Sequence, residues 1–177
     1  MEKENKVIYV CQGLQGSGKT TWAKQWAEED SENRIRINRD DIRNMLGKYW
    51  VPQREDFVTN IEDHCLIEAM KNGYDIVLDS MHLSSYQYNS LDYLISYINT
   101  TLRNYSYRIV CKPFPTPVSE CIRRDSEREN PIGKDIIINT YKKNEEFIHG
   151  IFGNDYIYEE SVQDKTLESS KEDTKEC

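Results

Sequence analysis

Residues 13–20 of the chain read GLQGSGKT, and this stretch decides the fold. It matches the pattern G-x-x-x-x-G-K-[ST] at every required position, follows an apolar run typical of a buried strand, and precedes a helical pattern. In such a context glycines allow backbone N–H groups to turn inward around phosphate oxygens, and the N-terminus of the helix adds partial positive charge. The stretch therefore predicts a phosphate-binding loop (P-loop) between a strand and a helix.

The polar residues of this loop predict a site for ATP and Mg²⁺. The Lys19 ammonium is expected to reach the β- and γ-phosphates, and the Thr20 hydroxyl is expected to hold the metal. The alternative is a glycine turn followed by a surface lysine, but a chance match in a chain of this length is well under about one in a hundred. The other residues expected to bind the nucleotide are Gly13, Gly16, Ser17, Gly18 and Thr21.

The rest of the chain alternates between strand patterns and helix patterns. Strands are expected at 6–12, 34–38, 74–79 and 106–111, and helices at 19–29, 55–71, 86–102, 118–124 and 135–148, with a further helix opening at Asp40. Such alternation predicts an α/β fold of the P-loop NTPase/kinase type, a three-layer sandwich with a mostly parallel central sheet and flanking helices, to which the family resemblance described below adds a helical lid. Residues 1–158 are expected to form this domain, and residues 159–177 an acidic tail without stable structure.

Charge is unevenly distributed along the chain. The net charge is −8, and the stretch 159–177 accounts for half of it with seven acidic and three basic residues. Between Arg34 and Arg54 the balance reverses, because six basic residues face only two aspartates. An acidic protein is not a general nucleic-acid binder, but a local basic cluster of this kind can bind phosphate, unless it is only a solvated face.

The five cysteines and the N-terminus favour a cytosolic protein. No C-x-x-C pair occurs, and an odd count favours reduced thiols. Cys11 and Cys111 lie in strand-like runs, where buried, inert thiols are expected. The sequence shows neither a signal peptide nor an apolar stretch of the roughly 20 residues that a membrane span needs.

A second polar motif follows the second expected strand. Residues 37–43 read INRDDIR, and ligands of an open parallel sheet gather beyond the C-terminal ends of its strands. A carboxylate there can accept the proton of an attacking hydroxyl, and an arginine three residues later can hold an acceptor phosphate. Alternatively, Asp40 or Asp41 caps the helix that begins here, which leaves the other one for catalysis.

Together these motifs resemble the 5′-kinase domain of bacteriophage polynucleotide kinases, over residues 6–145. The resemblance rests on GLQGSGKTTWA, on INRDDIR, on a strand that ends in VLDS, and on RRDSER before a proline and a final helix. It implies transfer of the γ-phosphate of ATP to the 5′-hydroxyl end of DNA or RNA, in the cytosol of a phage-infected or bacterial cell and without a membrane partner. The other two functions considered are a small-molecule kinase acting on a sugar acid, an antibiotic or a nucleotide sugar, and an ATP-binding regulatory module without acceptor chemistry.

The resemblance also implies roles for individual residues. Asp40 is implied to be the general base, and Arg43 to bind the phosphate next to the 5′-hydroxyl. Asp79 is implied to lie beside the acceptor and the water shell of the metal, so that either aspartate could contact Mg²⁺ through water. Arg124 and Arg128 are implied to form a lid over the donor phosphates, although acidic neighbours also make a plain salt-bridged helix possible. The residues expected to take part directly in catalysis are Lys19, Asp40, Arg43 and Arg128.

Two aromatic residues follow the second motif. Tyr49 and Trp50 are candidates for stacking against a terminal base. The alternative is that both rings pack against the core, which the sequence alone leaves open.

Overall fold

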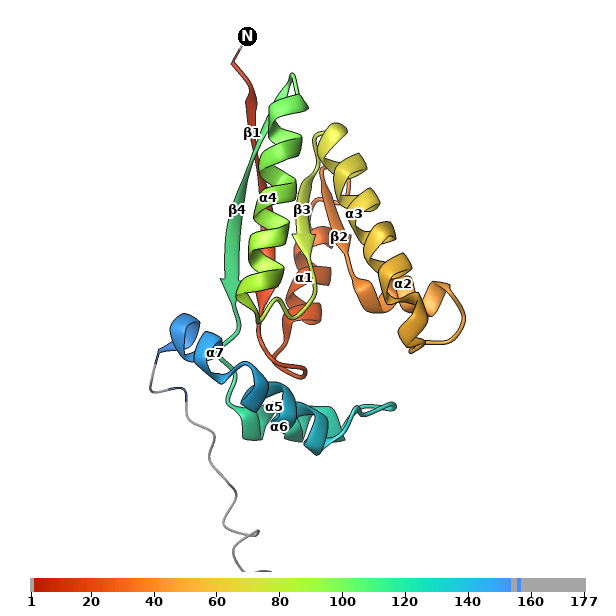
Figure 1. Cartoon of the computed structure of the whole chain (residues 1–177), viewed down its shortest axis with the longest axis vertical. Coiled ribbons are helices and arrows are strands. Elements are labelled where there is room, and N and C mark those ends of the chain that lie inside the picture. The colour runs from red at the N-terminus through yellow and green to blue at the C-terminus, as the bar shows by residue number, and fades with distance from the viewer. Residues whose placement is uncertain (1, 154–155, 157–177) are drawn as a thin grey trace, which may run out of the picture.

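A parallel sheet of four strands forms the centre of the molecule (Figure 1). The computed structural model describes residues 2–153 and residue 156. The strands lie in the order β2-β3-β1-β4, and every pairing between neighbours is parallel. Their bounds are β1 Glu4–Gln12, β2 Arg34–Ile37, β3 Asp75–Leu78 and β4 Tyr105–Pro113. This arrangement confirms the predicted α/β fold with a parallel sheet.

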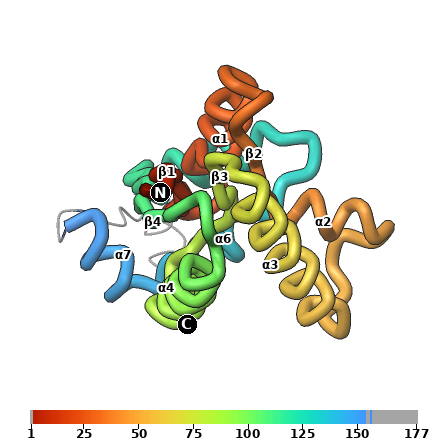
Figure 2. The backbone as a smooth tube through the Cα atoms, turned by 90° about the horizontal axis from the view of Figure 1, so that it is seen from above, coloured from red at the N-terminus to blue at the C-terminus, as the bar shows by residue number. Residues whose placement is uncertain are grey.

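Helices cover both faces of the sheet. Figure 2 shows α3 and α4 on one side of the strands and α1 on the other. The helices that flank the sheet are α1 Lys19–Glu28, α3 Glu55–Lys71 and α4 Ser85–Thr101. Those near or beyond its C-terminal edge are α2 Arg39–Met45, the short 3₁₀ helix η1 Pro52–Arg54, α5 Val118–Ser126, α6 Lys134–Lys143 and α7 Glu145–Phe152.

Strand β1 is apolar on both faces because it lies inside the sheet and helices cover both of its sides. Ile8 and Val10 belong to the core that α3 and α4 close. Tyr9 points the other way, toward α1, where it meets the rings of Trp22 and Trp26 edge-on at centroid distances of 5.5 and 5.4 Å. Side chains alternate along a strand, so a continuous apolar run is what a sheet covered on both faces requires.

A third apolar cluster lies beyond the C-terminal edge of the sheet. It joins α5, α6 and α7 to the P-loop through Leu14 and to the chain after β3 through Leu83, both of which are buried. Figure 1 shows these helices at the end of the sheet toward which the strands point. The segment predicted as a helical lid is therefore packed directly against the P-loop.

Some details differ from the expectations. The helix predicted at 135–148 is two helices, because the backbone leaves helical geometry at Asn144 with φ −118° and ψ 15°. Cys111 is exposed, so its predicted burial was wrong: β4 is an edge strand and leaves this side chain uncovered. The predicted acidic tail, 159–177, lies outside the described residues. Among the described helices, none is both long and apolar enough to cross a membrane.

Candidate active site

Glycines shape the P-loop between β1 and α1. Gly18 precedes α1 with a φ of 99°, and Gly16 has a φ of 81°, a region that L-residues with a side chain rarely adopt. A Cβ at Gly16 would also collide with the carbonyl oxygen of Cys121 in α5. The loop therefore needs glycine at this position both for its backbone conformation and for its close packing against α5.

Lys19 points back into this loop. Lys19 is buried, with 8% of the residue exposed. Its ammonium donates to the carbonyl oxygens of Gly13 at 2.9 Å and Leu14 at 2.6 Å. Burial lowers the pKa of Lys19 to about 8. A buried ammonium inside a loop of turned glycines is an arrangement that fits phosphate oxygens, which would offer it stronger acceptors than carbonyls do. Ser17 is buried in the loop, whereas Thr21 is exposed on α1.

Asp79 lies beside the P-loop hydroxyl, at the end of β3. The carboxylate is buried and accepts hydrogen bonds from Thr20 Oγ1 at 3.2 Å and from Arg36 Nε at 2.8 Å. An adjacent hydroxyl and carboxylate supply the hard oxygen ligands that Mg²⁺ prefers. Within the described part of the chain, no group of three or more His, Cys, Asp or Glu residues could hold a metal. Thr20 and Asp79 thus fit an ion that would take its other ligands from phosphate and water.

Asn38 connects the end of β3 to the start of α2. Its side-chain oxygen accepts from the backbone N–H of Asp41 at 2.9 Å, and its Nδ2 donates to the carbonyl oxygen of Asp79 at 2.6 Å. Asn38 is therefore the N-cap of α2. The alternative that Asp40 or Asp41 caps this helix was wrong, because the helix begins at Arg39, one residue earlier than expected, and both aspartates lie inside its first turn.

The two aspartates of α2 face different partners. Asp41 pairs with Arg36 Nη1 at 2.5 Å, on the side of β2. Asp40 accepts from Arg43 Nη1 at 2.6 Å and from the Tyr49 hydroxyl at 2.9 Å, and its side chain is 54% exposed. The structure thus brings Asp40 and Arg43 together, and it leaves both aspartate side chains more than half exposed.

Arg43 is held by a second carboxylate that the sequence reading missed. Glu55, at the start of α3, accepts from Arg43 Nε at 2.9 Å and from Arg43 Nη2 at 2.7 Å. Hydrogen bonding to Glu55 raises the pKa of Arg43, and the same bond lowers the pKa of Glu55. Two parallel bonds fix the plane of the guanidinium, so Glu55 orients Arg43 with its remaining nitrogen toward Asp40.

Arg39 extends this network along α3. Its guanidinium donates to Glu62 at 2.7 Å, to Thr59 at 3.0 Å and to Glu55 at 3.2 Å. The three acceptors lie at positions i, i+4 and i+7 of α3, which is one polar stripe of a helix. The spacing of these three polar residues in the sequence could have predicted that they share one face of α3. The signal for Arg36 was a charged residue inside the alternating strand RIRI.

The lid arginines lie near the loop but are paired with acidic neighbours. Arg124 Nη1 is 3.7 Å from where a Cβ of Gly18 would stand, which places its guanidinium against the P-loop. Arg124 also pairs with Glu120 at 2.7 Å, and Arg128 with Asp125 at 3.6 Å. The alternative of a salt-bridged helix therefore describes the ion pairs of α5. It leaves both arginines about half-exposed and available to exchange a carboxylate for a phosphate.

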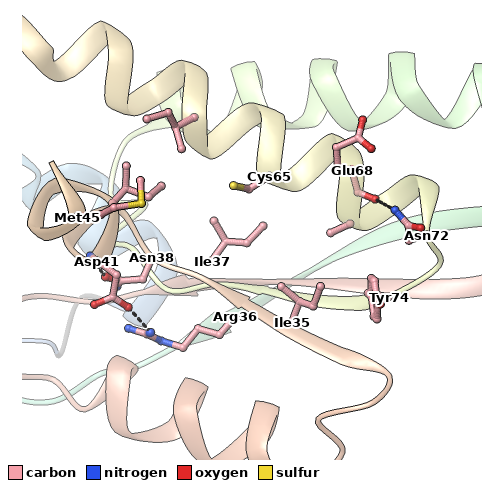
Figure 3. A pocket seen from close by; sticks show the side chains of 13 residues that line it. Ile35, Arg36, Ile37, Asn38, Asp41, Met45, Cys65, Glu68, Asn72 and Tyr74 are labelled. Carbon is pink, nitrogen blue, oxygen red and sulfur yellow. Dashed lines mark hydrogen bonds and ion pairs between the residues drawn. The ribbon is translucent and has the colours of Figure 1, made fainter.

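A pocket of about 530 Å³ lies away from this loop, between β2, α2 and α3 (Figure 3). Its walls are mainly apolar, and Figure 3 shows the ion pair of Arg36 and Asp41 at one end. None of the P-loop residues lines it. An apolar cavity of this kind does not suit phosphate, so the phosphates belong at the P-loop and not here.

The fold and the P-loop define the class of protein: a nucleotide-binding P-loop protein with a kinase-type α/β fold. A family model matches residues 7–142, and the chain belongs to that family, which is described as the AAA domain. ATP and Mg²⁺ are the ligands that such a fold generally binds.

Solved structures share this fold. A chain of the Pnkp1/Rnl/Hen1 RNA repair complex is 21% identical with a TM-score of 0.70, over 92% of this chain and 51% of that one. A chain of another Pnkp1/Rnl/Hen1 complex is 24% identical with a TM-score of 0.60, over 70% and 40%. The APS kinase CysC of Mycobacterium tuberculosis, solved with AMPPNP and APS, is 15% identical with a TM-score of 0.52, over 96% and 98%. This chain therefore spans about half or less of the two repair-complex chains, and the likeness shows the fold.

Proposed function

We propose that the chain transfers the γ-phosphate of ATP to the 5′-hydroxyl end of DNA or RNA. The observation that carries the proposal is the contact between Asp40 and Arg43, 2.6 Å apart at the C-terminal edge of the sheet that also bears the P-loop. A base for the hydroxyl and a cation for the neighbouring phosphate are the two groups that such an acceptor requires. The similarity to a chain of an RNA repair complex supports testing this acceptor first.

Each residue then has a defined part in the reaction. Asp40 accepts the proton of the 5′-hydroxyl, and Arg43, aligned by Glu55, binds the adjacent phosphate. Bound Mg²⁺ would neutralise charge on the donor phosphates, and Thr20 with Asp79 is the pair that would hold it.

The cations around the P-loop stabilise the negative charge on the transferred group. Lys19 donates to the donor phosphates from inside the loop, Arg124 approaches from α5, and Arg128 approaches from the segment just after α5. These positive groups stabilise the charge that spreads over the transferred phosphoryl group.

Replacing Asp40 by asparagine tests the base. Asp40→Asn keeps the size of the side chain but removes the proton acceptor, so phosphate transfer should fall by ~10²–10⁴, the usual contribution of a general base. ATP affinity should remain nearly unchanged, because Asp40 accepts hydrogen bonds from Arg43 and Tyr49, neither of which lies in the P-loop. Transfer of labelled phosphate to a 5′-hydroxyl oligonucleotide and ATP binding by calorimetry measure the two effects.

Asp41→Asn is the matched control, since it changes the adjacent carboxylate, which faces Arg36. A loss of transfer in Asp41→Asn as large as that in Asp40→Asn, or an equal loss of ATP binding and transfer in Asp40→Asn, would contradict the assignment. Equal phosphorylation of oligonucleotides, nucleosides and sugar acids would favour a small-molecule kinase. Absence of transfer to any hydroxyl, with ATP-dependent binding of a protein partner, would favour a regulatory module.

A further inference from the structure

Two aromatic rings stand exposed at the connection between α2 and α3. Tyr49 is 46% exposed and Trp50 is 53% exposed, and neither belongs to the apolar clusters of the core. The alternative that these rings pack against the core was therefore wrong. We call Tyr49 and Trp50 the aromatic shelf. Phe57, in the first turns of α3, is also exposed, at 54%, and enlarges the apolar surface on this side.

The aromatic shelf touches both residues assigned to the acceptor. The Tyr49 hydroxyl donates to Asp40 at 2.9 Å. The Arg43 guanidinium carbon lies 5.9 Å from the centroid of the Tyr49 ring and 5.4 Å from that of the Trp50 ring. A binding surface for the rest of the acceptor must adjoin these two side chains, and the aromatic shelf does so.

The charge around the shelf suits a polyanion. From Arg43 to Arg54 the chain holds three basic residues and no acidic one. Lys48, next to Tyr49, is exposed, and Arg54 is exposed at the end of η1. Exposed aromatic rings interleaved with cations are the combination with which proteins bind single-stranded nucleic acid, since bases stack on the rings and phosphates meet the cations.

We propose that the aromatic shelf stacks the base of the 5′-terminal nucleotide, in a way that tolerates any base. This inference rests on the proposed function, and it makes the shelf the feature that distinguishes a nucleic-acid end from other alcohols. Stacking uses the face of the base, which all bases share, so little sequence preference follows. Arg43 then lies between the stacked base and the neighbouring phosphate. The face of its guanidinium contacts the rings of the aromatic shelf, and its nitrogen atoms contact the phosphate oxygens.

The test compares Trp50→Ala with the wild type on two oligonucleotides. One carries a normal 5′-terminal nucleotide, and the other carries an abasic 5′-terminal sugar with the same hydroxyl and phosphates. For the normal end, Trp50→Ala should raise KM by about tenfold, the usual value of one base stacked on one ring. For the abasic end, the wild type and Trp50→Ala should have the same KM, because no base is present to stack.

Trp50→Phe supplies the rescue and Tyr93→Ala the matched control. Trp50→Phe keeps an aromatic face and should restore most of the affinity for the normal end. Tyr93 is 76% exposed on α4, away from Asp40 and Arg43, and its loss should leave KM unchanged for both ends. Thermal unfolding of each variant checks that the fold is retained.

Equal losses by Trp50→Ala on the normal and abasic ends, or no loss on either, would overturn the shelf while leaving the kinase in place. Failure of the wild type to phosphorylate either oligonucleotide would instead overturn the proposed function itself. The two failures are therefore distinguishable in the same experiment.

Discussion

Lys19 shows how burial prepares a single side chain for a ligand. Its ammonium donates to two carbonyl oxygens and a hydroxyl, and burial lowers its pKa to about 8, below the ordinary value of 10.5. The unfolded chain therefore binds more protons than the folded one between pH 8 and 10.5, so the stability of the folded protein rises with pH through that window. Bound phosphate oxygens would raise the pKa of Lys19, because they favour the charged ammonium.

ATP binding should consequently depend on pH through Lys19. Below pH 8 the residue is already charged and affinity should be flat; above pH 8 binding requires uptake of a proton, and affinity should fall by up to about tenfold per pH unit. Calorimetry in buffers of different ionisation enthalpy measures the proton uptake directly. Lys24→Met, an exposed lysine on the same helix, should keep the wild-type profile. An affinity that stays constant from pH 7 to pH 9.5 without proton uptake would refute this role of burial.

At the scale of elements, the start of α2 determines where the acceptor residues lie. Asn38 caps the helix and also donates to the backbone of Asp79, so one amide side chain joins α2 to the strand end beside Thr20. The position of Asp40 relative to the P-loop depends on this joint, because Asp40 lies in the first turn of α2, two residues after Asn38. A cap of this kind therefore has a positional as well as a stabilising role.

Asn38→Ala should lower both stability and activity. Loss of a cap destabilises by about 1 kcal/mol, and loss of the bonds to Asp79 adds to it; a misplaced base should also lower kcat by about tenfold or more. Ser84→Ala is the matched control, because Ser84 caps α4 by accepting from Gln87 N at 3.3 Å and has no hydrogen bond to the acceptor residues Asp40 and Arg43. It should lose about 1 kcal/mol and keep its kcat. Urea unfolding and single-turnover transfer measure the pair, and an equal kcat in Asn38→Ala and the wild type would exclude the positional role.

Over the whole molecule, the net charge is negative, but the region proposed to bind the acceptor is basic. The net charge of −8 opposes non-specific binding to nucleic acid, while Arg43, Lys48 and Arg54 lie together around the α2–α3 connection. Such a distribution suits recognition of one strand end better than tracking along a strand. The basic segment is brought to the C-terminal edge of the sheet by the turn from β2 into α2 (Figure 1).

Salt should therefore weaken oligonucleotide binding moderately. Each phosphate contact with a single strand contributes a slope of about −0.7 in log affinity against log salt, so about three contacts give a slope near −2 and roughly a fifteenfold loss from 50 to 200 mM salt. The KM of a 5′-hydroxyl oligonucleotide across this range tests the slope. A nucleoside without phosphate should show almost no change, and an oligonucleotide KM equally insensitive to salt would show that the basic cluster is only a solvated surface.

Local patterns in the sequence determined the P-loop and the order of strands and helices. The loop is read from contiguous residues because its chemistry uses consecutive backbone N–H groups, and β1 is read from a run that is apolar on both faces. These features depend on neighbours in the chain, so the sequence by itself was sufficient for the parallel α/β fold. The functional roles of Asp40, Arg43, Asp79 and the lid arginines stay predictions.

Only the tertiary structure decided which charges meet. Glu55 orients Arg43 from twelve positions along the chain, and Arg36 reaches Asp79 from forty-three positions away. The sequence also did not determine which side chains are exposed. Cys111 is exposed because β4 is an edge strand, and the aromatic shelf lies outside the core. Pairing and burial depend on how elements pack in space, which no periodicity of the sequence encodes.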